Sequence, residues 1–174
     1  MAAIERPSPS EYAEYYRGYV DLVPDGDLID TLMDQFDEAA LMLGPLTDAE
    51  ASRPYAPGKW TIKEVIGHVI DSERIFTYRA LRIARGDQTP LAGYDQDVFV
   101  KAAGFNRHTL AGLLGELHLA RRSTTGLFRG LSADELARTG VANDNPVSVR
   151  AIAWIIAGHE RHHVKIVRER YLPR

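Results

Sequence analysis

Four long segments with helical spacing of apolar residues constrain this chain most, because each must bury one face against the others. In the first segment Leu28, Leu32 and Phe36 recur one helical turn apart. No segment shows the alternation of apolar and polar residues that is typical of strands, and the apolar fragment 97–100 is too short to predict one. The sequence therefore predicts an all-α fold, with long helices at about 27–43, 61–85, 107–129 and 148–171.

Capping residues and helix breakers mark the boundaries of these segments. Thr61 and Glu64 form a capping box at the start of the second long helix, and Gly86 follows its end. Pro90 prevents an early restart, so residues 86–106 form a long connection. Shorter helices are expected at about 11–20, 47–50, 95–102 and after Ser132.

Four helices of this length predict a four-helix bundle in which the long connection is a crossover. The chain has 174 residues, of which 45% are hydrophobic, which is enough for one such core. We expect residues 27–172 to form the bundle domain, and residues 1–26 to pack on the bundle or flank it.

Composition and charge exclude several classes of function. The chain has no cysteine, which excludes disulfides, thiolate metal sites and a cysteine nucleophile. Its net charge of −3 gives no basic footprint for nucleic acid. The first ten residues lack the apolar core of a signal peptide, and no apolar run approaches the roughly 18 residues of a membrane span. We expect a cytoplasmic protein that binds neither nucleic acid nor membrane.

The last helix carries polar residues on its predicted apolar face. At about 100° per residue, His159, Glu160 and His163 share the face of Ile152 and Ile156. A buried polar group without a partner costs roughly 1–3 kcal/mol. Two imidazoles one turn apart can reach the same ion. The pattern predicts that His159 and His163 bind a divalent metal, with hydrogen-bonded core histidines as the alternative.

The run from His159 to His163 also matches the H-E-x-x-H motif of zinc proteases. Those proteases take a third ligand well downstream and place the helix beneath a sheet. Only eleven residues follow His163, none of them a histidine, and no sheet is predicted. The third ligand is therefore expected upstream, and His68 is the best candidate, although spacing alone does not prefer it to His118. Three histidines with an open coordination position are typical of a catalytic site.

Glu73 is the second anomaly of the pattern, because it lies at the centre of the apolar stripe of its helix. A carboxylate buried there should meet a cation, an imidazole N–H or the metal itself. A core salt bridge to Arg79 or Arg122 is the structural alternative.

Four further residues are candidates for roles near the site. Glu160 is next to a predicted ligand and is a candidate general base, or a carboxylate that orients an imidazole. Trp60, Tyr94 and Arg150 are candidates for lining a pocket, and each is equally well explained as a packing or surface residue.

The ordered motifs of the chain resemble those of the DinB/YfiT-like superfamily of metalloenzymes, over about residues 28–172. One histidine in the second long helix and H-x-x-x-H in the last make the set specific. The matching motifs are PGKWTIKE at 57–64, GHVIDSE at 67–73, RALR at 79–82, GYDQD at 93–97, SVRA at 148–151 and GHERHH at 158–163.

This resemblance implies a bundle with an unusual crossover, a homodimer, and a metal triad of His68, His159 and His163 completed by water or substrate. Zinc or nickel is the expected ion. The implied activities on a small-molecule substrate are thiol-dependent transfer, with a low-molecular-weight thiol as co-substrate, or hydrolysis by activated water. The alternatives are a non-catalytic, stress-associated metal-binding protein and a bundle without metal.

Overall fold

Three of the four long helices begin where the sequence predicts, and the third in chain order begins after Thr109 rather than at about residue 107. In the computed structural model, which describes residues 3–172, the side chain of Asp27 accepts from the backbone N–H groups of the first turn of one helix. Thr61 forms its capping box with Glu64, and Ser148 caps the last helix. The long helices are α2 (Leu28–Leu43), α4 (Ile62–Ala84), α6 (Leu110–Arg129) and α8 (Val149–Arg170).

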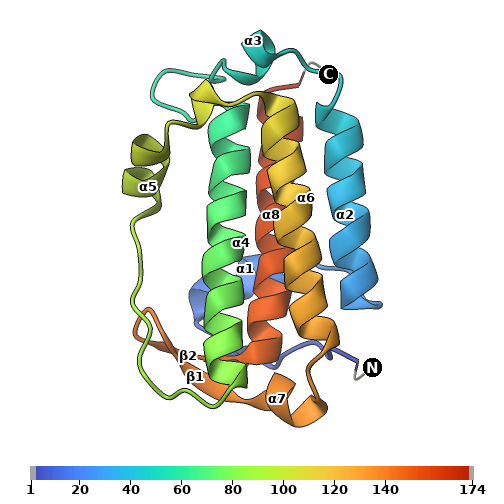
Figure 1. The fold of residues 1–174 in the computed structure, drawn as a ribbon, viewed down its shortest axis with the longest axis vertical. Coiled ribbons are helices and arrows are strands. Elements are labelled where there is room, and N and C mark those ends of the chain that lie inside the picture. Colours follow the sequence, from blue (N-terminus) through green and yellow to red (C-terminus); the bar gives the residue numbers. More distant parts are fainter. Residues whose placement is uncertain (1–2, 173–174) are drawn as a thin grey trace.

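The long helices form a bundle in which α4 and α6 run in the same direction (Figure 1). α2 and α8 run the opposite way. α2 packs beside α6, and α8 packs beside α4. Two consecutive parallel helices require a connection that travels the whole length of the bundle. That connection carries α5 (Gln96–Ala103) and the 3-10 turn η3 (Phe105–Arg107). The predicted four-helix bundle with a long crossover is confirmed.

The absence of strands was a wrong prediction. β1 (Thr139–Ala142) and β2 (Asn145–Ser148) form an antiparallel hairpin directly before α8. Asn143 and Asp144 both take positive φ angles of 51° and 60°, as a two-residue hairpin turn requires. Strands of four residues are too short to show an alternating pattern, so only this turn could have revealed them.

The hairpin holds the crossover connection against the bundle. Leu91 donates its N–H to the carbonyl of Val141, and its own carbonyl accepts from Asn143. Gly93 approaches the turn so closely that a Cβ at this position would overlap with the amide of Asn143. The hairpin therefore sets the position of residues 91–94.

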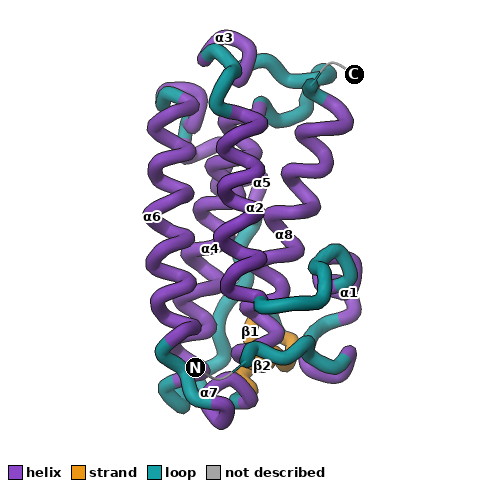
Figure 2. Tube along the Cα trace, turned by 90° about the vertical axis from the view of Figure 1, so that its right-hand side faces the viewer, coloured by secondary structure: helices purple, strands orange, loops and turns teal. Residues whose placement is uncertain are grey.

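The predicted helix at 11–20 is mostly wrong. This stretch forms two 3-10 turns, η1 (Pro9–Glu11) and η2 (Glu14–Tyr16), and only α1 (Arg17–Val20) is α-helical. The segment wraps around the start of α8 and lies beside it in Figure 2. The indole of Trp154 donates to the carbonyl of Ile4 at 3.1 Å, which ties the two together. Because of this cover, residues 151–160 are buried on every side of α8 rather than on one face.

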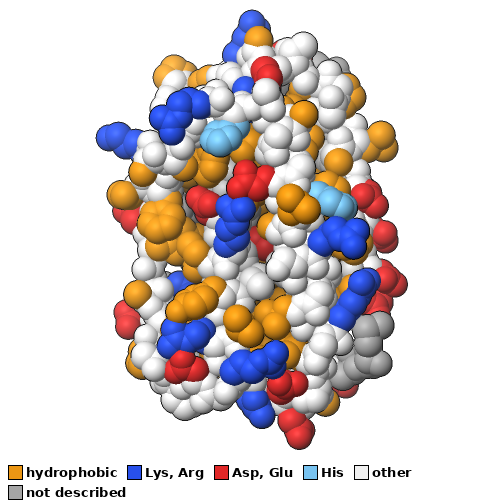
Figure 3. All heavy atoms as spheres, in the orientation of Figure 1, with side chains coloured by type: hydrophobic (Ala, Val, Ile, Leu, Met, Phe, Trp, Pro, Cys, Tyr) orange, Lys and Arg blue, Asp and Glu red, His pale blue; other side chains and the backbone are white. Residues whose placement is uncertain are grey.

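The ends of the bundle are closed by short elements. α3 (Asp48–Ala51) covers one end, and α7 (Ala133–Ala137) lies with the hairpin at the other (Figures 1 and 2). On the face shown in Figure 3, acidic and basic side chains are interspersed without a continuous basic band. Within residues 3–172, no helix combines the length and apolar character needed to cross a bilayer.

A polar layer crosses the middle of the bundle between two apolar clusters. One cluster joins the hairpin to the first turns of α8, and the other joins α3 to the first turns of α4 and α6. Between them all four long helices contribute buried polar groups. These include Gln35, His68, Ser72, Glu73, Arg121, His159 and Glu160.

Arg121 of α6 is 0% exposed and binds groups on the three other long helices. Its Nε and Nη2 donate to the two carboxylate oxygens of Glu73 on α4, at 2.9 and 2.8 Å. Nη2 also donates to Glu160 on α8 at 2.7 Å, and Nη1 donates to the carbonyl of Leu32 on α2. Gln35 of α2 donates its amide to the same carboxylate of Glu160. One guanidinium thus joins the whole bundle.

The salt bridge that was considered for Glu73 exists, but both suggested partners were wrong. Arg121 is the partner, whereas the neighbouring Arg122 is exposed. One residue turns a helix by about 100°, so an error of one position in the phase of α6 exchanges a core residue for a surface residue. Arg79 is also buried, but its guanidinium donates to the carbonyl of Ala92 and not to Glu73.

Replacing Arg121 with Met is expected to lower the free energy of unfolding by about 3–5 kcal/mol, because Glu73 and Glu160 would remain buried without their counter-charge. Equilibrium denaturation in urea measures this change. Arg122→Met is the matched control on the same helix and should change stability by less than about 0.5 kcal/mol. Replacing all three charged residues together with apolar ones should cost less than Arg121→Met alone. A larger cost would contradict this account.

Candidate metal centre

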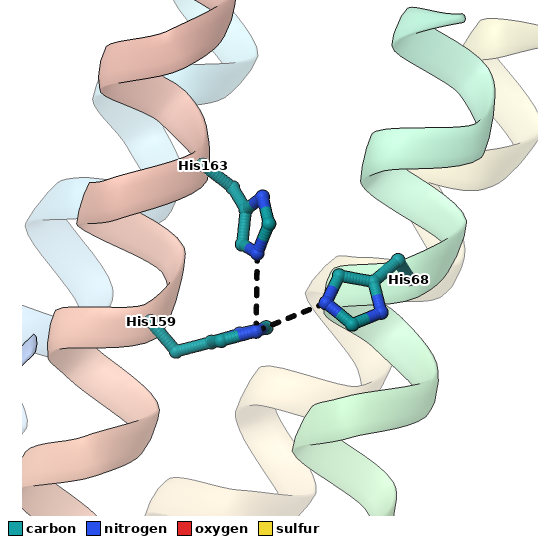
Figure 4. A group of neighbouring side chains, drawn as sticks. All are labelled: His68, His159 and His163. Atoms are coloured by element: carbon teal, nitrogen blue, oxygen red, sulfur yellow. Dashed lines mark hydrogen bonds between the residues drawn. The ribbon is translucent and has the colours of Figure 1, made fainter. Parts of the chain in front are cut away.

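Three imidazoles from two helices meet in the polar layer. His159 and His163 lie one turn apart on α8, and His68 faces them from α4 (Figure 4). Nε2 of His159 lies 3.1 Å from Nε2 of His68 and 3.2 Å from Nε2 of His163. The three candidate ligand atoms all lie within 4.8 Å of one another. The structure thus brings together the three histidines that the resemblance singled out.

Burial keeps these imidazoles in the neutral form. It lowers the pKa of His68 to about 4. Burial, followed by the charges of His68 and His162, lowers the pKa of His163 to about 3. His159 is shifted well below its ordinary pKa by burial and then by the other histidines. A neutral imidazole has one ring nitrogen with an unused lone pair, which is the form that binds a metal.

The arrangement fits a metal ion better than it fits hydrogen bonding alone. Nε2 of His159 carries either one proton or one lone pair, so it cannot form a full hydrogen bond with both neighbours. Two imidazole nitrogens bound to one zinc ion at a tetrahedral angle lie about 3.3 Å apart, because each Zn–N bond is about 2.0–2.1 Å long. The observed 3.1 and 3.2 Å agree with that spacing. The donor set therefore suits a divalent first-row ion.

No fourth His, Asp or Glu of residues 3–172 joins the group, and the sequence contains no cysteine. Structural zinc sites are closed by four protein ligands, whereas catalytic sites keep a position for water or substrate. Three ligands from the described chain leave such a position open.

Two hydroxyl groups, one on α4 and one on the crossover, lie on the Nδ1 side of His68. Ser72 Oγ lies 3.4 Å from Nδ1 of His68, one turn along the same helix. The hydroxyl of Tyr94 lies 2.7 Å from Ser72 Oγ. A proton on Nδ1 directed at Ser72 leaves the lone pair of Nε2 facing the other two histidines. Contacts of this kind fix the tautomer and orientation of a ligand.

Aromatic rings enclose the cluster on both sides. Tyr19 of α1 and Phe76 of α4 stand edge-on to His159, with ring centroids 5.5 and 6.0 Å away. On the other side Trp60 packs on His68 at 5.0 Å. Gly158 permits the approach of α1, since a Cβ there would overlap with the carbonyl of Tyr19. The rings give the cluster apolar surroundings, which strengthens electrostatic interactions within it.

Two cavities reach the cluster, one beside His159 and one beside His163. A cavity of about 210 Å³ is lined by His159 and by the tyrosines of the N-terminal segment. A second, of about 270 Å³, is lined by His163, Trp60 and Asp97. The cluster is therefore accessible to small molecules, and Trp60 and Tyr94 lie where a pocket-lining role was considered.

Three other candidate residues lie away from the imidazoles. Glu73 and Glu160 bind Arg121, and neither carboxylate has a hydrogen bond to a histidine among the described residues. Arg150 is nine residues before His159 on α8, and it binds Glu11 through two bonds of 2.7 Å. That contact lowers the pKa of Glu11 to about 2.

His118, which spacing alone left open as a ligand, packs against Phe36 with ring centroids 4.8 Å apart. It does not join the cluster. Spacing could not separate it from His68, because the choice depends on which helix lies opposite α8.

Sequence reasoning missed Ser72, Tyr19 and the tyrosines beside it. Ser72 could have been found, since it lies one helical turn after His68. The sequence has an unusually dense group of tyrosines near its start, which could have indicated the aromatic lining of a cavity. They are Tyr12, Tyr15, Tyr16 and Tyr19. Nothing in the sequence indicates that this lining faces α8.

Comparison with known proteins agrees with the fold and with the predicted family. A family model described as the DinB superfamily matches residues 31–167, which is most of the chain. The chain belongs to the DinB superfamily. The predicted resemblance is therefore confirmed.

Individual relatives of this DinB-superfamily protein carry names that mention a metal. A Bacillus pumilus protein named "Putative metal-dependent hydrolase" is 28% identical over 144 residues, which cover 81% of each chain. "Putative metal-dependent hydrolase YfiT" of Bacillus subtilis is 23% identical over 127 residues, 71% of each chain.

The solved structure of Bacillus subtilis YfiT has the same fold as this DinB-superfamily chain. The matched region covers 95% of this chain and 90% of the YfiT chain, with a TM-score of 0.71 and 20% sequence identity. The description of that solved structure calls YfiT "a probable metal-dependent hydrolase with an unusual four-helix bundle topology". The parallel pair α4 and α6 with its long crossover is consistent with that topology.

The free energy of unfolding of the metal-free protein should decrease as the pH falls from 6.5 toward about 4. In this range the unfolded chain binds protons at His68 that the folded chain does not, so the stability present above pH 6.5 is lost on acidification. For His68 alone the loss is roughly 3 kcal/mol. Urea denaturation at several pH values measures it. His68→Gln should reduce the slope, whereas the exposed His108→Gln should leave it unchanged. Equal slopes in all three proteins would refute the assignment.

Ser72→Ala should lower the affinity for a divalent metal by roughly tenfold, because His68 loses the contact that orients it. Competition with a chromophoric chelator measures the affinity. Ser123→Ala, at an exposed position of α6, is the control. An unchanged affinity in Ser72→Ala would show that this hydroxyl does not support the ligand.

Proposed function

We propose that this DinB-superfamily chain is a metal-dependent hydrolase of small molecules, with His68, His159 and His163 as the metal ligands. One observation carries the proposal: three neutral imidazoles converge beside a cavity, and the described chain supplies no fourth ligand. The names of the relatives, which are given as metal-dependent hydrolases, support the same reaction class.

A divalent ion with an open position lowers the pKa of the water or thiol that it binds, and so supplies a nucleophile at neutral pH. The protein residues hold and enclose this chemistry. The hydroxyls of Ser72 and Tyr94 would favour the tautomer of His68 whose Nε2 has a free lone pair. Tyr19 and Phe76 cover His159 with aromatic rings.

Proton transfer in this site is assigned to residues at the cavity walls. Burial raises the pKa of Tyr16, Tyr19 and Tyr94, so their hydroxyls stay protonated at neutral pH and donate hydrogen bonds. Asp97 is the one carboxylate among the described residues that line the two cavities at the cluster. In this proposal its carboxylate is the candidate group for accepting a proton from the nucleophile. Glu160, which was considered for this role, is occupied by Arg121 and Gln35.

A low-molecular-weight thiol is the alternative occupant of the open position. The product would then be a thioether: the thiol sulfur bonds to a carbon of the electrophile, the bond from that carbon to its leaving group breaks, and the leaving group takes up the proton of the thiol. The same three histidines would hold the metal in both reactions, so the difference lies in which nucleophile the cavity admits.

Purified protein is expected to contain about one divalent ion per chain, because one cluster of ligands is present. Elemental analysis by mass spectrometry measures it. The double variant His159→Ala/His163→Ala should lose the ion, and His108→Ala should retain it. An unchanged metal content in the double variant would refute the ligand assignment.

Activity is tested with the metal restored, on a panel of ester and amide substrates with and without an added low-molecular-weight thiol. Hydrolysis without thiol is expected, and it should fall by at least about 100-fold in the double variant and in the presence of a chelator. Turnover only with thiol would replace hydrolysis by transfer. Bound metal without turnover in either assay would favour the non-catalytic alternative.

A further inference from the structure

The cavity beside His159 has an unusual lining. Its walls consist of aromatic rings, uncharged amides and one guanidinium, and no carboxylate from residues 3–172 lines it. The tyrosines come from the N-terminal segment and the crossover, and Asn143 comes from the turn of the hairpin. The lining includes Tyr16, Tyr19, Phe76, Arg79, Tyr94 and His159.

Arg79 supplies the charge of this cavity, and it is 96% buried, with 4% of its surface exposed. Its side chain donates to the carbonyl of Ala92 at 2.7 Å. Within residues 3–172 no Asp or Glu oxygen lies within 4.0 Å of its guanidinium. Glu73, the partner considered from the sequence, binds Arg121 instead. A buried cation without an anion is costly, so its presence calls for a ligand.

Several of the groups around Arg79 can donate hydrogen bonds. The guanidinium has five N–H groups, and its hydrogen bond to Ala92 uses one of them. Burial raises the pKa of the Tyr16 and Tyr94 hydroxyls, and the charge of Arg79 acts on both in the opposite direction, so all three groups share one space. Protonated phenols and a guanidinium together favour an anion over a neutral or cationic molecule.

The position of Arg79 relative to the metal ligands limits the shape of that anion. The ring of Phe76 lies 6.0 Å from the ring of His159 and 5.8 Å from the guanidinium carbon of Arg79. The guanidinium therefore lies within about 12 Å of the His159 ring. A molecule that spans the two would place an aromatic or aliphatic body against Phe76 and the tyrosines.

We infer that Arg79 is the anchor of a carboxylate-binding subsite, and that the substrate is a small organic acid with an apolar body. The inference rests on the proposed function for the reacting end of the molecule, which would lie at the histidine cluster. The acid group lies at the other end of the cavity and does not take part in bond making or breaking. Arg79 is thus a specificity residue.

Binding of 3-phenylpropionate and of its neutral isostere 3-phenylpropionamide tests the inference. Each is titrated into the full-length protein, with its metal bound and after metal removal, by isothermal titration calorimetry or by NMR. The metal-free titration matters because a carboxylate can also bind a metal. The acid should bind at least about tenfold more tightly than the amide in both forms. A failure of the proposed hydrolase activity would leave this preference intact, so the two outcomes are separable.

Arg79→Met should abolish the preference for the acid, while Arg82→Met should preserve it. Arg82 lies less than one turn along the same helix and is paired with Asp87 on the surface. The urea midpoint of the ligand-free Arg79→Met protein should stay close to that of the unmodified protein, although the preference for the acid is lost, since no ion pair within residues 3–172 is removed. A purely structural arginine would show the reverse, with a lower urea midpoint and an unchanged preference.

Three results would overturn the inference. They are equal affinity for acid and amide in the unmodified protein, no saturable binding of either, and an acid preference that persists in Arg79→Met. If Arg79→Met does not fold, the comparison of acid and amide in the unmodified protein and in Arg79→Lys decides the question. The lysine variant keeps the charge and should retain a reduced preference.

Discussion

The buried guanidinium of Arg121 holds the four long helices in one register, because it bonds to groups on the other three. A charge removed from water is tolerated only where its donors are all directed at acceptors. Sliding one helix by a single residue, about 1.5 Å, would break these bonds. Glu160 directly follows His159, and Glu73 lies on the helix of His68. The same register therefore places the imidazoles, although the network has no hydrogen bond to any of them among the described residues.

The bundle supplies the metal ligands, whereas irregular segments supply much of the cavity wall. Tyr19 comes from the N-terminal segment, Tyr94 from the crossover and Asn143 from the hairpin turn. Hydrogen bonds between Leu91 and the hairpin fix the crossover, so these segments form a connected wall. Loops of this kind can change without disturbing a bundle core.

Arg121 and Arg79 show two uses of a buried positive charge. Arg121 meets two carboxylates and a carbonyl, and it stabilises the fold through specific pairing. Arg79 has no carboxylate partner within the described chain and faces a cavity beside the candidate metal centre. A charge left without its counter-ion lowers stability, and such a cost is typical of functional sites. Of these two buried arginines, Arg121 thus stabilises the fold, and Arg79 is the one proposed to bind a ligand.

The sequence by itself determined the four long helices, most of their caps and the spacing of His159 and His163, because periodicity, capping boxes and i, i+4 spacing are local properties of the chain. It also indicated that Glu73 needs a partner inside the core: a cation, an imidazole N–H or a metal. The tertiary structure alone decided that this partner is Arg121 and not Arg122, that the hairpin exists, and that a tyrosine wall faces His159. Each of these depends on which surfaces meet across distant parts of the chain, and a helical phase or a four-residue strand carries too little local information to specify that.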